Sequence, residues 1–226
     1  MTRMDRLCNP KYADLGMLIM RVLTALMIVH HGQDKLQHTE GFSTNVIAAY
    51  FPLLPGPPVF WTYLSAGFEL IGSFCIAAGL ATRVAALLLA GTMANAMLFH
   101  LQRFGLQSFP FNPPAGGAYT YEPSWLILGV TTCIALAGPG RFAVHPNFRK
   151  TPDADLGMLI VRVLTALMIV HHGQDKLQHT EGFSTNVIAA YFPFLPGPPV
   201  FWTYLSAGFE LVGSFCIAVG LATRVA

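Results

Sequence analysis

Six apolar runs alternate with polar, turn-rich segments along the chain. They span residues 15–29, 59–80, 84–99, 125–137, 156–170 and 200–221. About 20 helical residues are needed to cross ~30 Å of hydrocarbon, and each run approaches that length when its flanks are included. The pattern predicts an all-α integral membrane protein. Its first four runs form a four-helix transmembrane bundle, and its last two add two further transmembrane helices.

The last two runs are a second copy of the first two. Residues 154–226 repeat residues 13–85 at an offset of 141, with four differences in 73 positions. The differences are Met20/Val161, Leu53/Phe194, Ile71/Val212 and Ala78/Val219. A shared fold does not require identical loops, so a recent tandem duplication explains this identity. We therefore divide the chain into a cytoplasmic N-terminal segment (1–12), a four-helix unit (13–150) and a truncated second copy (154–226).

Composition excludes several classes of protein. Charged residues make up 11% of the chain, against about 25% in an ordinary soluble domain. A soluble surface with so few charges would aggregate, and the mean hydropathy of +0.52 agrees with a membrane protein. A net charge of +2 excludes nucleic-acid binding by phosphate neutralisation. The four cysteines form no C-x-x-C pair, so we expect neither a disulfide framework nor a zinc ribbon.

The distribution of basic residues predicts the orientation in the membrane. With the N-terminus inside, eight basic residues lie in cytoplasmic segments, and only Lys35, Arg103 and Lys176 lie in outer loops. Four helices return the chain to its starting side, so the second copy inserts in the same direction as the first. This is a parallel repeat, unlike the inverted repeats common in secondary transporters.

Polar residues inside the apolar runs mark the candidate site. Ionisable groups in hydrocarbon are costly and usually face the interior of a bundle. Arg21, His31 and Lys35 share one face of the first helix, while Glu69 and Asn95 lie on the polar stripes of the next two. A rise of ~1.5 Å per residue puts His31, Glu69 and Asn95 together in the outer half of the bilayer, with Arg21 about 11 Å below Glu69. The alternatives are an Arg21 that reaches the inner headgroups and a protonated Glu69 that only bonds a neighbouring helix.

The histidines do not predict a metal site. His30 and His31 are adjacent, and their Cα–Cβ directions differ by ~100°, so one helix should not aim both at one ion. Lys35 lies between His31 and His38 on one face and would repel a cation. We therefore assign no metal ligands. The absence of a G-x-G-x-x-G, P-loop or G-x-S-x-G motif from the sequence also excludes nucleotide-binding and hydrolase functions of those types.

The outer loops carry many aromatic residues, which have two interpretations. They are Phe51, Trp61, Phe109, Phe111, Tyr119, Tyr121 and Trp125. Such residues commonly form an aromatic belt at the membrane interface. The alternative is a partly buried lid over a site that opens at the outer face.

Three short motifs follow Arg21 in the first unit: H-G-Q-D-K-L at 31–36, G-F-E-L-I-G at 67–72 and G-L-A-T-R at 79–83. Together they resemble the DoxX family of small bacterial four-helix membrane proteins. The resemblance implies a plasma-membrane bundle linked to redox chemistry, because founding members are similar to a small subunit of a thiosulfate:quinone oxidoreductase and others are implicated in oxidant defence. By that match, the motif positions are His31, Lys35, Glu69 and Arg83, and in the second copy His172, Lys176, Glu210 and Arg224.

The leading hypothesis is that the protein is a membrane subunit of a redox system and therefore part of an oxidoreductase. This subunit would contact a quinone or a small sulfur species. His31 and Lys35 would polarise or protonate the reduced oxygen, and Glu69 would relay the proton. Further candidates for cofactor contact are Arg21, Asn95 and Arg83. No covalently bound cofactor is expected, and a partner protein would supply electrons. The alternatives are a non-catalytic anchor or assembly factor for redox proteins and, less favoured, a small-solute transporter.

The second copy repeats the polar stripe of the first without the two helices that cover it. Leaving Arg162 and Glu210 towards membrane lipid would cost on the order of several kcal/mol. We therefore expect the second copy to dock on the first unit, or on another protomer in a homo-oligomer. The competing interpretations are an incomplete coding sequence and a vestige held only by its own helix pair.

Overall fold

The computed structural model describes residues 10–111, 113–114, 117–145 and 153–221, and these are all helical or loop in structure. The long helices are α2 (Pro10–Gln37), α4 (Pro58–Ala78), α5 (Thr82–Phe104), α6 (Glu122–Ala137), α7 (Asp153–Gln178) and α9 (Pro199–Val219). All but α6 are long and apolar enough to span a membrane, and α6 is a shorter apolar helix. The predicted all-α, multi-pass membrane fold is confirmed. Five of the eight basic residues that predict the orientation lie outside the described residues: Arg3, Arg6, Arg149, Lys150 and Arg224, the last of which is also a motif position.

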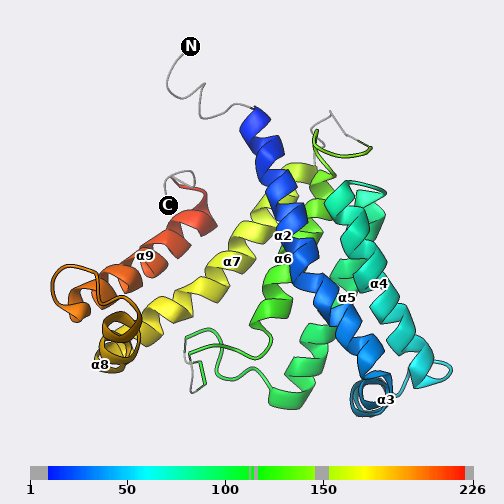
Figure 1. Ribbon diagram of the computed structural model, residues 1–226, viewed down its shortest axis with the longest axis horizontal. Helices are drawn as coiled ribbons and strands as arrows, with labels where there is room; N and C mark the ends of the chain where they lie inside the picture. The colour runs from blue at the N-terminus through cyan, green and yellow to red at the C-terminus, as the bar shows by residue number, and fades with distance from the viewer. Residues whose placement is uncertain (1–9, 112, 115–116, 146–152, 222–226) are drawn as a thin grey trace.

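The two copies run in the same direction. In Figure 1, α2 and α7 both descend from the upper end of the molecule to the lower end. There each is followed by a short helix, α3 (Thr39–Phe42) or α8 (Thr180–Phe183), and by a π-helical segment, η1 (Ser43–Ala48) or η2 (Ser184–Ala189). The chain then returns upward through α4 or α9. The repeat is therefore parallel, as the sequence predicts.

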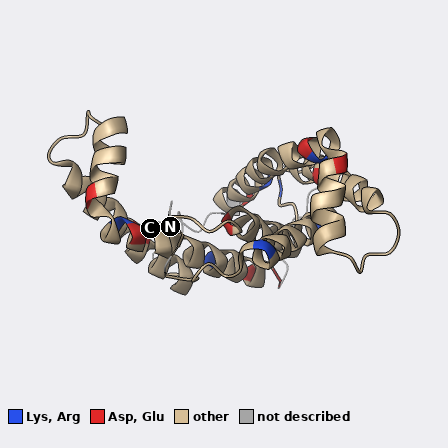
Figure 2. Cartoon of the chain, turned by 90° about the horizontal axis from the view of Figure 1, so that it is seen from below, with Lys and Arg blue, Asp and Glu red and all other residues tan. Residues whose placement is uncertain are grey.

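The first unit and the second copy form one continuous arrangement of packed helices. Helix α4 lies between α2 and α5, α5 packs on α6, α6 packs on α7, and α7 packs on α9. Figure 2 shows α7 and α9 reaching away from the ring formed by the first four long helices, with few charged residues on any of them. The main helix contact between the second copy and the first unit is therefore that of α7 with α6.

Proline and glycine set the limits of α4. It begins at Pro58, where a missing backbone N–H costs nothing, and ends at Ala78, before Gly79, whose φ of +78° favours glycine. The Leu80 N–H donates to the Cys75 carbonyl across this turn at 2.8 Å. A Cβ at Gly79 would also lie 2.7 Å from Ala143 Cα, so the segment after α6 could not pack there. The G-L-A-T-R motif therefore forms a tight turn that aligns α4 with α5.

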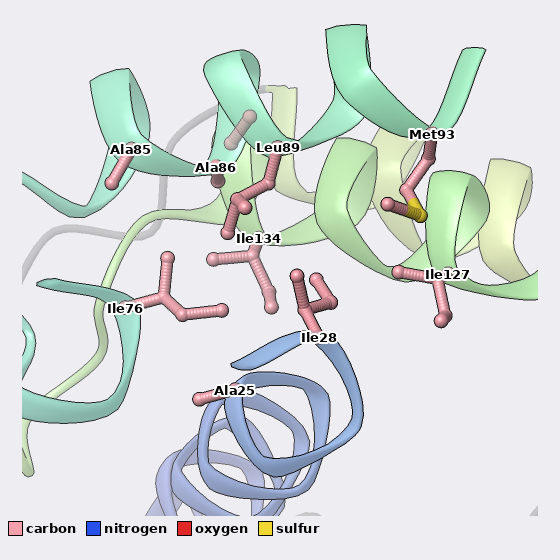
Figure 3. Packing of buried hydrophobic residues seen from close by; sticks show 10 residues of the cluster. Ala25, Ile28, Ile76, Ala85, Ala86, Leu89, Met93, Ile127 and Ile134 are labelled. Atoms are coloured by element: carbon pink, nitrogen blue, oxygen red, sulfur yellow. The ribbon is translucent and has the colours of Figure 1, made fainter. Parts of the chain in front are cut away.

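A small apolar core lies where the four helices of the first unit meet. Figure 3 shows Ile28, Ile76, Leu89 and Ile134 converging from α2, α4, α5 and α6, and each is fully buried. Gly72 lets α5 approach α4, because a Cβ there would lie only 3.0 Å from Leu89 Cγ. Lipid is as apolar as these side chains, so close packing rather than exclusion from water holds them together.

Candidate functional site

A cavity of about 500 Å³ lies within the first unit, between this core and the end of the molecule that carries η1. Its walls come from α2, η1, α4, α5 and the start of α6. Most lining side chains are apolar or aromatic. The polar lining residues are His31, Lys35, Ser65, Glu69, Thr92, Asn95, His100, Thr120 and Ser124. The cavity therefore has the composition of a small-molecule site, with apolar walls and few polar groups.

Lys35 and Glu69 form a buried ion pair in the cavity wall. Lys35 Nζ lies 2.5 Å from Glu69 Oε1 and donates to Ser65 Oγ at 2.8 Å. The Lys35 side chain is 11% exposed and that of Glu69 only 1%. The Phe42 ring lies 5.1 Å from the ammonium, which adds a cation–π contact.

The residue spacing in the H-G-Q-D-K-L motif explains how this pair forms. Gly32 lies one turn before Lys35 on the same face of α2. A Cβ at Gly32 would lie 2.8 Å from Leu70 Cγ and 3.1 Å from the Ala66 carbonyl oxygen. Glycine thus brings α2 close to α4, and Lys35 can then reach the carboxylate.

The pair retains unused hydrogen-bonding capacity. Glu69 Oε2 is buried and has no hydrogen-bond partner among the described residues. Lys35 carries three N–H donors, and its two bonds to Ser65 and Glu69 use two of them. A donor and an acceptor are therefore both available at one point of the cavity wall. A buried polar atom without a partner is uncommon, and in a cavity wall it is placed to bond a group of a ligand.

His31 and Asn95 line the same cavity, as does His100, which the sequence analysis did not select. Asn95 Nδ2 donates to the Gly91 carbonyl of its own helix at 2.9 Å. His100 is half-buried, and its Nδ1 has no partner in the described structure. The sequence signal that could have identified His100 is its position as a histidine in an otherwise apolar helix, five residues after Asn95.

The outer aromatic residues divide between two locations. Phe51 and Trp61 line the cavity, and Trp61 Nε1 donates to the Pro55 carbonyl at 2.8 Å.

The second group of aromatic residues clusters around Met168 of α7: Phe109, Trp125 and two buried tyrosines, Tyr119 and Tyr121. Burial raises the pKa of the Tyr121 hydroxyl to about 12, and this hydroxyl donates to the Leu106 carbonyl. Only the first group covers the cavity, and the second joins the two copies.

Arg21 and Arg83 lie away from the cavity lining. Arg21 is 1% exposed and donates to the Pro139 and Phe142 carbonyls at the opposite end of the bundle. It therefore holds the segment after α6 against α2, and it is not among the residues that line the cavity. Arg83 is half-buried in the first turn of α5. The structure thus brings His31, Lys35, Glu69 and Asn95 together, but not the two arginines.

The second copy repeats the ion pair in a more open setting. Lys176 Nζ contacts Glu210 Oε1 and donates to Ser206 Oγ at 2.9 Å, and the Phe183 ring lies 5.0 Å away. The Glu210 side chain is 25% exposed, whereas that of Glu69 is 1%. Helix α5 covers Glu69 in the first unit, whereas the described part of the second copy has no helix in the equivalent position. Glu210 is therefore more exposed than Glu69.

Helix α7 docks on α6 through small residues. A Cβ at Gly157 would lie 3.1 Å from the Cys133 Cα and carbonyl oxygen, and Gly129 faces Leu164 at a similarly short distance. Trp125 Nε1 donates to the Leu164 carbonyl at 3.2 Å. Small residues that let helix backbones approach are typical of packed transmembrane helices. The second copy therefore docks on the first unit.

The fold and the cavity define a multi-pass membrane bundle with a buried ion pair. Residues 16–102 and 157–226 match the family model described as DoxX, so the chain belongs to the DoxX family. It is also 35% identical over 136 residues to a Bacillus subtilis (strain 168) protein described as "Putative oxidoreductase CatD", an alignment that covers 60% of this chain and 89% of that protein. No solved structure matches the chain.

Proposed function

We propose that the protein is the membrane subunit of a quinone-linked redox system and binds the quinone head group in the cavity of the first unit. The observation that carries this proposal is the Lys35–Glu69 pair, which is buried in the wall of a mostly apolar cavity of about 500 Å³. The similarity to a protein described as an oxidoreductase supports the same class of function.

The unused donor and acceptor of the ion pair fit a quinone. A quinone carbonyl accepts hydrogen bonds and becomes a hydroxyl donor when reduced. The third N–H of Lys35 would donate to the carbonyl, and Glu69 Oε2 would accept from the hydroxyl. The apolar and aromatic walls, which include Phe51, Trp61 and Phe68, suit the ring and the start of an isoprenoid tail.

The reaction takes up two electrons and two protons for each quinone reduced. A redox partner protein supplies the electrons. Lys35 and His31 stabilise negative charge on the reduced oxygen, and Glu69 passes protons to it. Asn95, on α5 in the cavity lining, orients the ring through its side-chain amide.

The same proposal includes a location. The protein lies in a bacterial plasma membrane with its N-terminus in the cytoplasm, so the cavity is in the outer half of the bilayer. Cysteine substitutions at His38 and Arg141, two well-exposed positions at opposite ends of the bundle, test the orientation when labelled with an impermeant thiol reagent in spheroplasts. We expect labelling at position 38 and protection at position 141, and the reverse pattern would invert the topology.

Quenching of tryptophan fluorescence tests quinone binding directly, because Trp61 lines the cavity. Purified protein in mild detergent is titrated with a short-chain ubiquinone. We expect saturable quenching that is lost in Trp61→Phe, and an affinity at least about tenfold weaker in Lys35→Met, a loss of ~1.4 kcal/mol or more. Glu69→Gln should keep the fold and bind quinone but lose quinone reduction in native membranes.

The second copy supplies matched controls. Lys176→Met and Glu210→Gln alter an equivalent pair that lines no part of this cavity, so both variants should bind quinone as the unmodified protein does. Equal affinities for Lys35→Met and Lys176→Met would refute the proposed site. Co-purification of a soluble redox enzyme with no quinone binding would instead support the anchor or assembly function.

A further inference from the structure

Docking of the second copy creates a cluster of three potential metal ligands. Glu122 begins α6, and His171 and His172 are adjacent on α7. His172 Nε2 lies 2.8 Å from Glu122 Oε1, and His171 Nε2 lies 3.3 Å from Glu122 Oε2. One donor atom from each of the three residues falls within 4.8 Å of the others. The cluster lies outside the cavity, whose lining includes none of these residues.

The cluster has buried donor atoms with no hydrogen-bond partner in the described structure. His171 is completely buried, and its Nδ1 has no hydrogen-bond partner in the described structure. Its Nε2 and Glu122 Oε2 meet only in the 3.3 Å ion-pair contact and form no hydrogen bond there. Buried polar atoms without a hydrogen bond destabilise the folded state, so most such atoms in proteins have a partner. A ligand between the imidazole and the carboxylate would satisfy both.

We propose that Glu122, His171 and His172 bind a single divalent transition-metal ion of the zinc class. Two imidazoles and one carboxylate are a known set of protein ligands for Zn²⁺, with a water in the fourth position. Zn–N and Zn–O bonds of ~2.0–2.1 Å place tetrahedral ligands about 3.3 Å apart. The three donors lie within 4.8 Å of one another, so rotations of the side chains would bring them to this spacing.

The adjacent histidines can serve one ion because their rings lean together beyond Cβ. The His171 and His172 ring centroids lie 4.2 Å apart with planes tilted by 35°. His30 and His31 have nearly the same geometry, at 4.1 Å and 36°. The ~100° between Cα–Cβ directions therefore does not keep the Nε2 atoms apart. Among the described residues, His30 and His31 form no such three-ligand cluster with a carboxylate, whereas His171 and His172 form one with Glu122.

A lysine near the histidines does not oppose the metal. Lys176 follows His172 by one turn of α7 but is turned towards α9, where it pairs with Glu210. The negative charge of Glu122 remains directed at the two rings. The metal would join α6 to α7 and so fasten the second copy to the first unit.

Cobalt is the probe for this site, because its visible spectrum reports coordination by nitrogen and oxygen. Full-length protein in detergent is treated with a chelator, exchanged into buffer and titrated with Co²⁺ and then with Zn²⁺. A His38→Asn/His179→Asn background removes the two exposed His–Asp pairs on α2 and α7–α8 as competing sites. We expect one Co²⁺ per chain, displaced by Zn²⁺, and a higher melting temperature with Zn²⁺.

The duplicated sequence provides the control. His171→Asn/His172→Asn and Glu122→Gln should each abolish the spectrum and the Zn²⁺-dependent rise in melting temperature. His30→Asn/His31→Asn, the same change in the first copy, should leave both intact. If the double variant does not fold, as judged by circular dichroism, His172→Asn alone replaces it, because that residue is half-exposed. Equal Co²⁺ stoichiometry and affinity in the variants of the two copies would overturn the proposal.

Discussion

Helices α2 and α7 have nearly the same sequence but bury different faces. In α2 the buried side chains include Arg21, Thr24 and Ile28, whereas in α7 they include Met168 and His171. Met27, the counterpart of Met168, is 53% exposed, while Met168 is fully buried. The difference arises from the neighbours: α2 turns towards the bundle interior, and α7 presents its other side to α6. The sequence of a transmembrane helix with two apolar faces therefore does not decide which face is buried.

The contacts within each helix pair are the same in both copies. Gly32 and Gly173 each approach the backbone of the following long helix, at 3.1 Å and 3.0 Å from an alanine carbonyl. Ser43 bonds Thr62 at 2.8 Å, and Ser184 bonds Thr203 at the same distance. The pair is thus a local unit that the repeated sequence encodes. The enclosed cavity is not local, because it also needs α5 and α6.

The largest expected contrast comes from removing the second copy by truncation after Lys150. All residues lining the cavity lie in the first unit, so the shortened protein should bind quinone with an affinity within about twofold of the full chain, a difference of ~0.4 kcal/mol. Binding of Co²⁺ should disappear, because two of its three ligands are gone. Size-exclusion chromatography in the same detergent measures the oligomeric state. A change from dimer to monomer would show that the second copy also assembles protomers, and loss of quinone binding would show that the unit is not independent.

The next contrast concerns the two ion pairs. Lys35→Met leaves the carboxylate of Glu69 buried without its partner, which we expect to cost about 3–5 kcal/mol of the free energy of unfolding. Lys176→Met should cost about 1 kcal/mol or less, because Glu210 is partly exposed and its charge is screened. Denaturation in mixed micelles, followed by circular dichroism, measures both. Similar losses in the two variants would mean that the cover of α5 does not strengthen the pair.

A third contrast tests how α7 docks. Gly157→Leu forces a side chain against the backbone of Cys133 and should cost about 1–3 kcal/mol, as overpacking generally does. Gly16→Leu, the same change in the first copy, meets open space and should have little effect on the free energy of unfolding. The Zn²⁺-dependent rise in melting temperature should also vanish only in Gly157→Leu, since the ligands would separate. An equal effect of both substitutions would contradict the docked arrangement.

The features that the sequence predicts best are those that depend on a single pair of consecutive helices. The membrane class, the parallel repeat and the polar stripes with Lys35 and Glu69 all follow from apolar length, identity at an offset of 141 and helical spacing. The hydrogen-bond partners of Arg21 could not be predicted from the sequence, because they are the carbonyls of Pro139 and Phe142, far away along the chain. The convergence of Glu122 with the second pair of histidines was also missed. It depends on which face of α7 packs on α6. The nearly identical sequences of α2 and α7 bury different faces, so the sequence alone does not predict this contact.

The smallest contrast concerns a single hydrogen bond between the copies. Trp125→Phe keeps most of the ring packing but removes the donor to the Leu164 carbonyl, so we expect a loss of about 0.5–1.5 kcal/mol. Trp202→Phe removes a bond to the Pro196 carbonyl in an exposed loop, and it should change the free energy of unfolding by no more than about 0.5 kcal/mol. Both are measured by the same denaturation assay. In the protein truncated after Lys150, Trp125→Phe should lose its effect, since Leu164 is no longer present. An effect that persists there would assign Trp125 a role within the first unit instead of between the copies.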